Sequence, residues 1–193
     1  MQEKLNKLYQ ECIQELENIR IDILNNNDIG TIEITMSKRN NKRYGACKQE
    51  KPDPNTMYTE KIGRRKIVKY WKYKKHIIEI SPWVMNLDET IIKNTIMHEL
   101  IHCMPHCSNH GEVFKKYANY INEALGYDIS RVGNKAEDHK KSNIEYNEKK
   151  EYKYKIECKR CKQTFYRQRY NKNFTRKYKC GKCGGEFKLW KIN

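Results

Sequence analysis

The sequence is poor in apolar residues, and no long apolar run occurs in it. Hydrophobic residues make up 37% of its 193 positions, and the mean hydropathy is -1.05. No stretch approaches the roughly 20 apolar residues that a membrane-spanning helix needs. The amino terminus also lacks the apolar segment of a secretory signal. We therefore expect an intracellular protein with a small core, located in the cytoplasm or with the nucleoid or nucleus.

Acidic residues are scarce towards the carboxyl end. Lys and Arg number 40 against 24 Asp and Glu, a net charge of +16. Residues 1–134 hold 21 basic and 17 acidic side chains, whereas residues 135–193 hold 19 basic and 7 acidic ones. This basic segment lacks the apolar helical stripe that lipid binding needs, so its charge favours nucleic acid over membrane as partner.

The pattern of apolar residues predicts an α+β domain. Helical spacing predicts helices over residues 2–24, 89–103 and 112–125, the second capped by Asp88 and the third ended by Gly126. Alternation predicts a strand over 32–36, and residues 66–80 suit one long strand or a hairpin. A polar connection is expected up to Cys47, and no regular structure around the prolines that follow.

Three segments follow from this pattern. Residues 1–132 form the predicted α+β domain, residues 133–150 contain almost nothing apolar and are interpreted as a charged linker, and residues 151–193 form a small basic domain.

One metal-binding motif lies inside the best-patterned helix. His98, Glu99 and His102 form H-E-x-x-H, in which histidines four apart lie one turn above each other and face one zinc ion. Glu99 flanks the water that such a zinc activates and suits the role of general base. The pattern indicates zinc-dependent hydrolysis of peptide bonds.

A catalytic zinc needs a third protein ligand and an open position. The metzincin spacing would place that ligand at Ser108, which excludes the metzincin class. His110 is the preferred candidate, because eight residues after His102 allow the chain to reverse. His106, Glu112 and Glu123 remain alternatives.

The eight cysteines include two C-x2-C pairs separated by 18 residues. Thiols of an intracellular protein stay reduced, so paired cysteines indicate metal rather than disulfides. Two such pairs predict one closed structural zinc site, a zinc ribbon, whose ligands are Cys158, Cys161, Cys180 and Cys183. Of the other cysteines, Cys103 and Cys107 are weak ligand candidates.

Basic and aromatic residues alternate within this ribbon. Aromatic faces stack on unpaired bases while Arg and Lys contact phosphates, a combination suited to single-stranded or distorted DNA. Phe165, Phe174 and Phe187 are expected to form the small core. The predicted DNA contacts are Tyr166, Arg167, Arg169, Tyr170 and Arg176.

Together these residues resemble the SprT-like (Spartan-related) zinc metalloprotease family, in particular its compact microbial or viral members. The resemblance rests on the Gly-x-Cys segment at Gly45–Cys47, on H-E-x-x-H, on the His-Gly-x-x-Phe element from His110 to Phe114, and on the four-cysteine ribbon. It implies a zincin-like fold, zinc at His98, His102 and His110, Glu99 as catalytic base, a DNA-binding ribbon, and proteins crosslinked to DNA as substrates.

The expected function is that of a DNA-associated zinc endopeptidase, acting as a monomer on DNA-bound or DNA-crosslinked proteins. Its metal content would be one catalytic and one structural zinc ion. Two alternatives stay open: a nucleic-acid-binding ribbon protein with an inactive H-E-x-x-H site, and a metalloprotease specific for one regulator.

Overall fold

The computed structural model describes residues 1–38, 42–131, 133–146 and 152–192. The chain divides into two compact units, Met1–Tyr146 and Asn147–Asn193. None of the helices in the described ranges combines the length and apolar character that crossing a bilayer requires. The architecture is α+β, with small sheets in both units.

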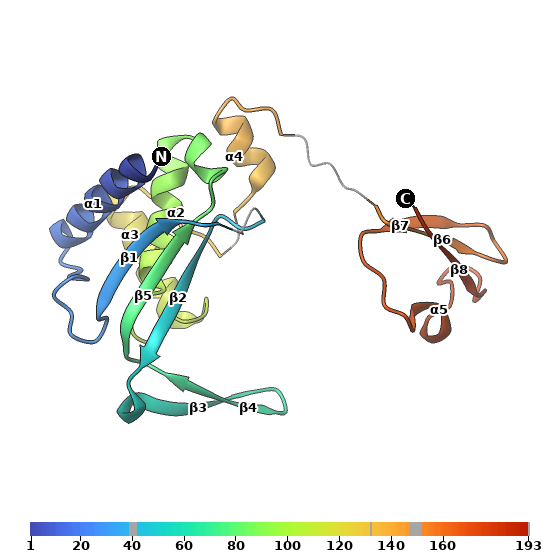
Figure 1. Cartoon of the computed structure of the whole chain (residues 1–193), viewed down its shortest axis with the longest axis horizontal. Coiled ribbons are helices and arrows are strands. Elements are labelled where there is room, and N and C mark those ends of the chain that lie inside the picture. The colour runs from blue at the N-terminus through green and yellow to red at the C-terminus, as the bar shows by residue number, and fades with distance from the viewer. Residues whose placement is uncertain (39–41, 132, 147–151, 193) are drawn as a thin grey trace. The chain divides into compact units, whose positions relative to one another are not determined.

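The first unit has a three-stranded sheet with helices on one face (Figure 1). β5 lies in the middle, β1 is parallel to it and β2 antiparallel. Side chains of β5 are buried at alternate positions, which places Ile78 and Ile80 in the core formed with α1, α2 and α3. The elements of this unit are α1 (Gln2–Asn18), β1 (Thr31–Met36), β2 (Gly45–Pro52), β3 (Met57–Ile62), β4 (Arg65–Tyr70), β5 (Tyr73–Ile80), α2 (Glu89–Ile101), α3 (Glu112–Leu125) and α4 (Lys135–Lys141).

The sheet contains strands that the sequence did not predict. Gly45–Pro52 forms β2 where a polar connection and irregular structure were expected. Because β2 is an edge strand of the described sheet, its polar side chains stay largely exposed and Pro52 is tolerated at its end. The next proline, Pro54, opens a short 3-10 turn capped by Asp53.

The prediction of one strand or hairpin over residues 66–80 was wrong. This stretch holds β4 and β5, which do not pair with each other: β4 pairs with β3, while β5 pairs with β1 and β2. The turn of the hairpin lies between Ile62 and Arg65, outside the predicted stretch. Trp71 and Lys72 instead bond to the turn at 53–56, which separates the β3–β4 hairpin from the central sheet.

Helix α1 ends at Asn18, earlier than the apolar pattern indicated. Arg20 has a left-handed backbone (φ 63°), and the Ile21 amide donates to the Leu16 carbonyl to close the helix end. Ile21 and Ile23 remain buried although the chain is no longer helical. The apolar spacing therefore continued past the helix because the extended chain packs on the same core.

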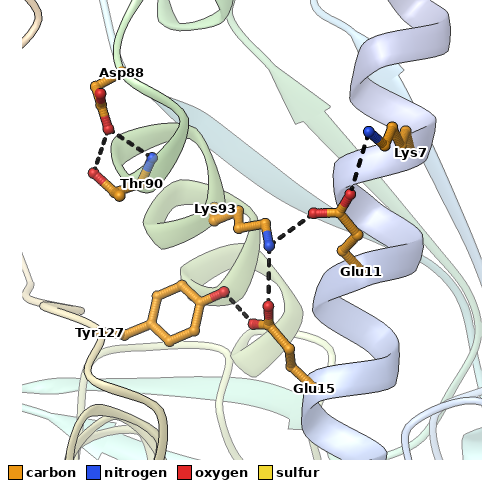
Figure 2. A network of polar contacts seen from close by, with 7 residues as sticks. All are labelled: Lys7, Glu11, Glu15, Asp88, Thr90, Lys93 and Tyr127. Atoms are coloured by element: carbon orange, nitrogen blue, oxygen red, sulfur yellow. Dashed lines mark hydrogen bonds and ion pairs between the residues drawn. The ribbon is translucent and has the colours of Figure 1, made fainter.

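Partly buried ion pairs join α1 to α2 (Figure 2). Lys93 of α2 lies 2.7 Å from a Glu11 carboxylate oxygen and 3.0 Å from one of Glu15, and the Tyr127 hydroxyl also donates to Glu15. Only 19% of the Lys93 side chain is exposed. Burial alone would lower the pKa of Lys93, but the hydrogen bonds to both glutamates outweigh it and raise the pKa.

Replacing Lys93 with alanine is expected to destabilise the first unit by about 1–3 kcal/mol, because two partly buried carboxylates lose their shared cation. The matched control is Lys7→Ala, which removes an exposed cation from the same network at a cost of at most about 0.5 kcal/mol. Urea unfolding followed by far-ultraviolet circular dichroism measures both. Equal stability of the two variants would contradict this role for Lys93.

The helix that carries the H-E-x-x-H motif and the helix that follows it agree with the sequence. The Asp88 side chain accepts a hydrogen bond of 2.9 Å from the Thr90 amide at the start of α2. Gly126 ends α3 in the left-handed conformation, φ 74°, with its amide bonded to the Asn122 carbonyl.

Part of the stretch predicted as a linker is folded onto the first unit. Asn134 caps the short helix α4, and His139 on that helix stacks on Trp83 at 5.5 Å between ring centroids. The Tyr44 hydroxyl donates to Asp138. These contacts need few apolar residues, which is why composition did not reveal them.

The second unit is a small antiparallel sheet in the order β7-β6-β8. Phe165, Phe174 and Phe187 pack with ring centroids 5.4 to 6.2 Å apart, as predicted for its core. Its elements are β6 (Tyr154–Cys158), β7 (Thr164–Arg167), α5 (Phe174–Lys177) and β8 (Phe187–Lys191).

Candidate functional site

Three imidazoles converge in the first unit. His98 projects from α2, His102 is the C-cap residue of that helix, and His110 comes from the turn before α3. The His110 Nε2 lies 2.9 Å from the His98 Nε2 and 3.2 Å from the His102 Nε2. The structure therefore brings together the three histidines that the sequence favoured.

Contacts around the cluster fix the direction of the rings. The His102 Nδ1 lies 2.6 Å from the Cys107 carbonyl, so Nδ1 carries the proton and Nε2 presents a free lone pair. Phe114 is buried beneath the cluster, with its ring centroid 4.7 to 4.9 Å from each of the three imidazoles. The short loop after α2 thus brings His110 back beside His98 and His102.

The donor set fits a zinc ion. Ligands 2.0–2.1 Å from a tetrahedral zinc are about 3.3 Å apart, close to the nitrogen separations seen here. Burial lowers the pKa of all three histidines, that of His98 to about 4, so the rings are neutral and able to bind metal. Three protein ligands leave a fourth position for water or substrate.

The alternative ligands lie elsewhere. His106 has a left-handed backbone, is exposed, and lies against Trp71 and Tyr58 of the hairpin region. Glu112 and Glu123 are exposed on α3 and do not belong to the His98, His102 and His110 group. Among the described residues, His110 is therefore the only sequence candidate that reaches the pair on α2.

Glu99 lies beside the histidines and is only 6% exposed. Burial raises the pKa of its carboxyl to about 7, although the Cys47 amide and the positive charge of Arg43 both act to lower it. A carboxyl group with a pKa near neutrality both accepts and returns a proton at physiological pH.

Gly45 explains how β2 approaches Glu99 so closely. A Cβ built at position 45 would lie 2.8 Å from the Glu99 Oε1 and 2.9 Å from its Cγ. The resemblance singled out this Gly-x-Cys segment, and the structure gives its physical role: the glycine makes room for the carboxylate.

Replacing Gly45 with alanine is expected to lower peptide cleavage about 10- to 100-fold while zinc stays bound, because displacing Glu99 by even 1 Å misplaces the base. Steady-state cleavage rates and the zinc content measure this. Gly181→Ala is the control, since a Cβ there meets nothing within 4 Å. An unchanged rate for Gly45→Ala would show that Glu99 tolerates the shift.

The cluster opens into a cavity of about 1110 Å³. Its walls include Arg43 and Gln49 on the β2 side, and Asp128 and Arg131 in the segment after α3. The space is large enough to admit a segment of peptide.

Four cysteines converge in the second unit. The Sγ atoms of Cys158 and Cys183 are 3.4 Å apart, and those of Cys161 and Cys180 are 3.6 Å apart. Thiolates 2.3 Å from a tetrahedral zinc are about 3.8 Å apart, so four thiols in one cluster fit a structural zinc site. A Cβ at Gly185 would lie 2.9 Å from the Cys158 Sγ, so only glycine fits there.

Backbone amides already favour thiolates at this cluster. The Cys161 amide lowers the pKa of Cys158 to about 6, and the amides of Lys182 and Cys183 lower that of Cys180. Metal binding requires deprotonated thiols, so these amides lower the proton cost of binding zinc at Cys158 and Cys180. At Cys183 the Gly185 amide acts in the same direction, but burial and the neighbouring thiols outweigh it and raise the pKa to about 12.

The predicted DNA contacts fall on different parts of the ribbon. Tyr166 is 50% exposed, and strand register places it on the same sheet face as Lys155 and Trp190. Arg167 lies on the opposite face, over the rings of Phe165 and Phe174.

The remaining predicted contacts lie outside the strands. Arg169 and Tyr170 follow β7, the latter next to Tyr154, and Arg176 is exposed on α5. Lys155 and Trp190 were not among the predicted contacts; the alternation in β6 and β8 was the signal that could have placed them on the face of Tyr166.

Comparison with protein families finds one match: the model of the SprT-like family covers residues 5–135. No curated protein matches the chain. The matched region contains β2, α2 and α3, and with them the three histidines and Glu99.

Proposed function

The chain belongs to the SprT-like family, which is associated with zinc metallopeptidases, and on this basis we propose that it is a DNA-associated zinc-dependent endopeptidase with a zincin-like active site. The observation that supports the proposal most strongly is the convergence of three neutral imidazoles beside one buried carboxyl group. Water, not a side chain, would be the nucleophile.

His98, His102 and His110 would hold the catalytic zinc through Nε2. When bound, the zinc supplies a Lewis acid that polarises the scissile carbonyl and makes water more acidic. Glu99 accepts the proton of the attacking water on its carboxylate and delivers it to the leaving amine. The Cys47 amide lies close enough to the Glu99 carboxyl to favour its ionised form.

The edge of the sheet offers a place for the substrate backbone. Within the described residues β2 pairs with β5 alone, so its other edge faces outward beside Glu99. An extended peptide could add there as a further strand, with main-chain hydrogen bonds that do not depend on sequence. Such binding suits an enzyme that cuts many different proteins.

The ribbon supplies a surface for single-stranded DNA. Its face with Tyr166 and Trp190 carries Lys155 and Lys188 over the Trp190 ring, at 5.7 and 4.9 Å. Exposed aromatic rings stack on unpaired bases and the lysines contact phosphates. Binding DNA would raise the local concentration of DNA-bound substrates, including proteins crosslinked to it.

The proposal is tested with purified protein and a basic DNA-binding protein as substrate, with and without single-stranded DNA. We expect cleavage that DNA stimulates and that Glu99→Gln lowers about a thousandfold. Binding of DNA with no cleavage of free, DNA-bound or crosslinked substrate would favour the alternative, a nucleic-acid-binding protein with an inactive site. Cleavage of one native regulator at a single position, unaffected by DNA, would favour the other alternative.

Affinity for single-stranded DNA is expected to fall with salt, with a slope of about -4 in log K against log salt for about six phosphate contacts. Arg169→Ala should reduce this slope by about 1, whereas Tyr166→Ala should weaken binding about tenfold and leave the slope unchanged. Fluorescence anisotropy at several salt concentrations measures both. The control is Tyr120→Ala, an exposed tyrosine of the first unit. Equal affinities for the wild type and the three variants would exclude Tyr166 and Arg169 as DNA contacts.

A further inference from the structure

A second group of metal-binding side chains lies in the first unit, outside the three-histidine cluster. Cys47 of β2, His76 of β5 and Cys103 just after α2 bring two Sγ atoms and a ring nitrogen within 4.8 Å of one another. Cys47 pairs with Ile78, two residues from His76, so Cys47 and His76 lie on the same face of the sheet. These residues have no common sequence motif and meet only in the fold.

His76 is a buried polar side chain whose ring nitrogens have no hydrogen-bond partner among the described residues. Its side chain is 1% exposed, and neither ring nitrogen makes a hydrogen bond. The Ile29 backbone lies close enough to favour the protonated ring without meeting hydrogen-bond geometry, yet burial dominates and lowers the pKa of His76. A buried neutral imidazole whose nitrogens have no partner is destabilising, and a bound metal ion would offset that cost.

The two thiols have the separation expected of a metal-bound pair. The Cys47 Sγ lies 3.7 Å from the Cys103 Sγ, and both cysteines are free. Two thiolates on a tetrahedral zinc are about 3.8 Å apart. The ribbon cysteines, whose spacing already indicates zinc, show 3.4 and 3.6 Å.

We propose that Cys47, His76 and Cys103 bind a thiophilic metal ion, zinc or copper(I), at a site distinct from the three histidines and from the ribbon. Two thiolates and one imidazole are ligands that both ions prefer. Copper(I) is satisfied by three ligands. Zinc takes a fourth, and the partly exposed side of Cys47 is where a water would enter.

A metal ion at this site would link α2, the helix that carries His98 and Glu99, to the central sheet. Cys103 directly follows the ligand His102, and Cys47 is two residues from Gly45, where β2 lies against the Glu99 carboxyl. A metal ion shared by these cysteines and His76 would join the end of α2 to β2 and β5. It would be a structural ion, which takes no part in the chemistry but keeps Glu99 in position.

The test counts metal ions per chain by elemental mass spectrometry. Full-length protein is stripped of metal without oxygen, reloaded with Zn²⁺ or, separately, Cu⁺, and desalted. With at least one of these two metals, Cys47→Ala and His76→Leu should each hold one ion fewer than the wild type. Cys12→Ala, which removes a fully buried free thiol of α1, should match the wild type. The comparison does not depend on whether the three-histidine site is filled.

The wild type alone gives a second measurement that needs no folded variant. If the histidine and ribbon sites are filled, a third equivalent of metal supports the site. With the histidine and ribbon sites filled, a wild-type count of two with both metals would overturn the proposal. Counts in Cys47→Ala and His76→Leu equal to the wild type with both metals would overturn it whatever the filling of the three-histidine site.

Discussion

Replacing Glu99 with glutamine is expected to lower the rate of peptide cleavage about a thousandfold and to leave the zinc in place. Glutamine has the shape of glutamate and fits against Gly45, but it cannot accept a proton. His98, His102 and His110 keep their positions, so metal affinity should not change. Single-turnover cleavage rates, together with the zinc content of the purified variant, measure the two effects.

Glu112→Gln is the matched control for this prediction. Glu112 is exposed in the first turn of α3, close in sequence to His110, and sequence reasoning kept it as an alternative ligand. Its variant should cleave at the wild-type rate and retain zinc. A Glu99→Gln protein that cleaves within tenfold of the wild type would show that another group removes the proton.

Replacing Cys161 with serine is expected to unfold the second unit and abolish binding to single-stranded DNA. The few fully buried residues of this unit include Ile156 and Cys158, too small a core to fold without metal. A structural zinc contributes of the order of 10–16 kcal/mol, so loss of one ligand removes most of the folding energy. Limited proteolysis, metal content and DNA anisotropy should change together.

The first unit should be unaffected by Cys161→Ser, because its core and its histidines lie in a separate compact unit. The control is Lys162→Ser, which changes the exposed neighbour of Cys161 without touching the thiol cluster. A Cys161→Ser protein whose second unit still resists proteases and binds DNA would mean that zinc is not what folds the ribbon.

Helices α2 and α3 could be predicted from the sequence because their ends are set locally. Asp88 caps one and Gly126 ends the other, and both act within a single turn of chain. By contrast, β2 was missed: its side chains are mostly polar and partly or fully exposed, and only pairing with β5 makes it a strand. Edge strands of this kind are decided by tertiary contacts.

The same distinction, between features set by local sequence and features set by tertiary contacts, holds for the candidate metal sites. The ribbon cysteines and the pair of histidines on α2 have fixed spacing, because the ligands come from one turn of helix or one tight loop. The sequence favoured His110 as the third ligand but could not show where it lies. Its position depends on the loop after α2, in which the Cys107 carbonyl bonds to the His102 ring. The group of Cys47, His76 and Cys103 has no spacing signal at all, because its members come from two strands and a helix end.

Anomalous diffraction at the zinc absorption edge, from crystals of the protein grown with zinc, tests the central claim most directly. We expect a peak bound by the Nε2 atoms of His98, His102 and His110, with the Glu99 carboxyl beside it, and a second peak among the four ribbon thiols. A map with no peak at the three histidines, or with His110 turned away from the ion, would contradict the assignment of this cluster as the active site.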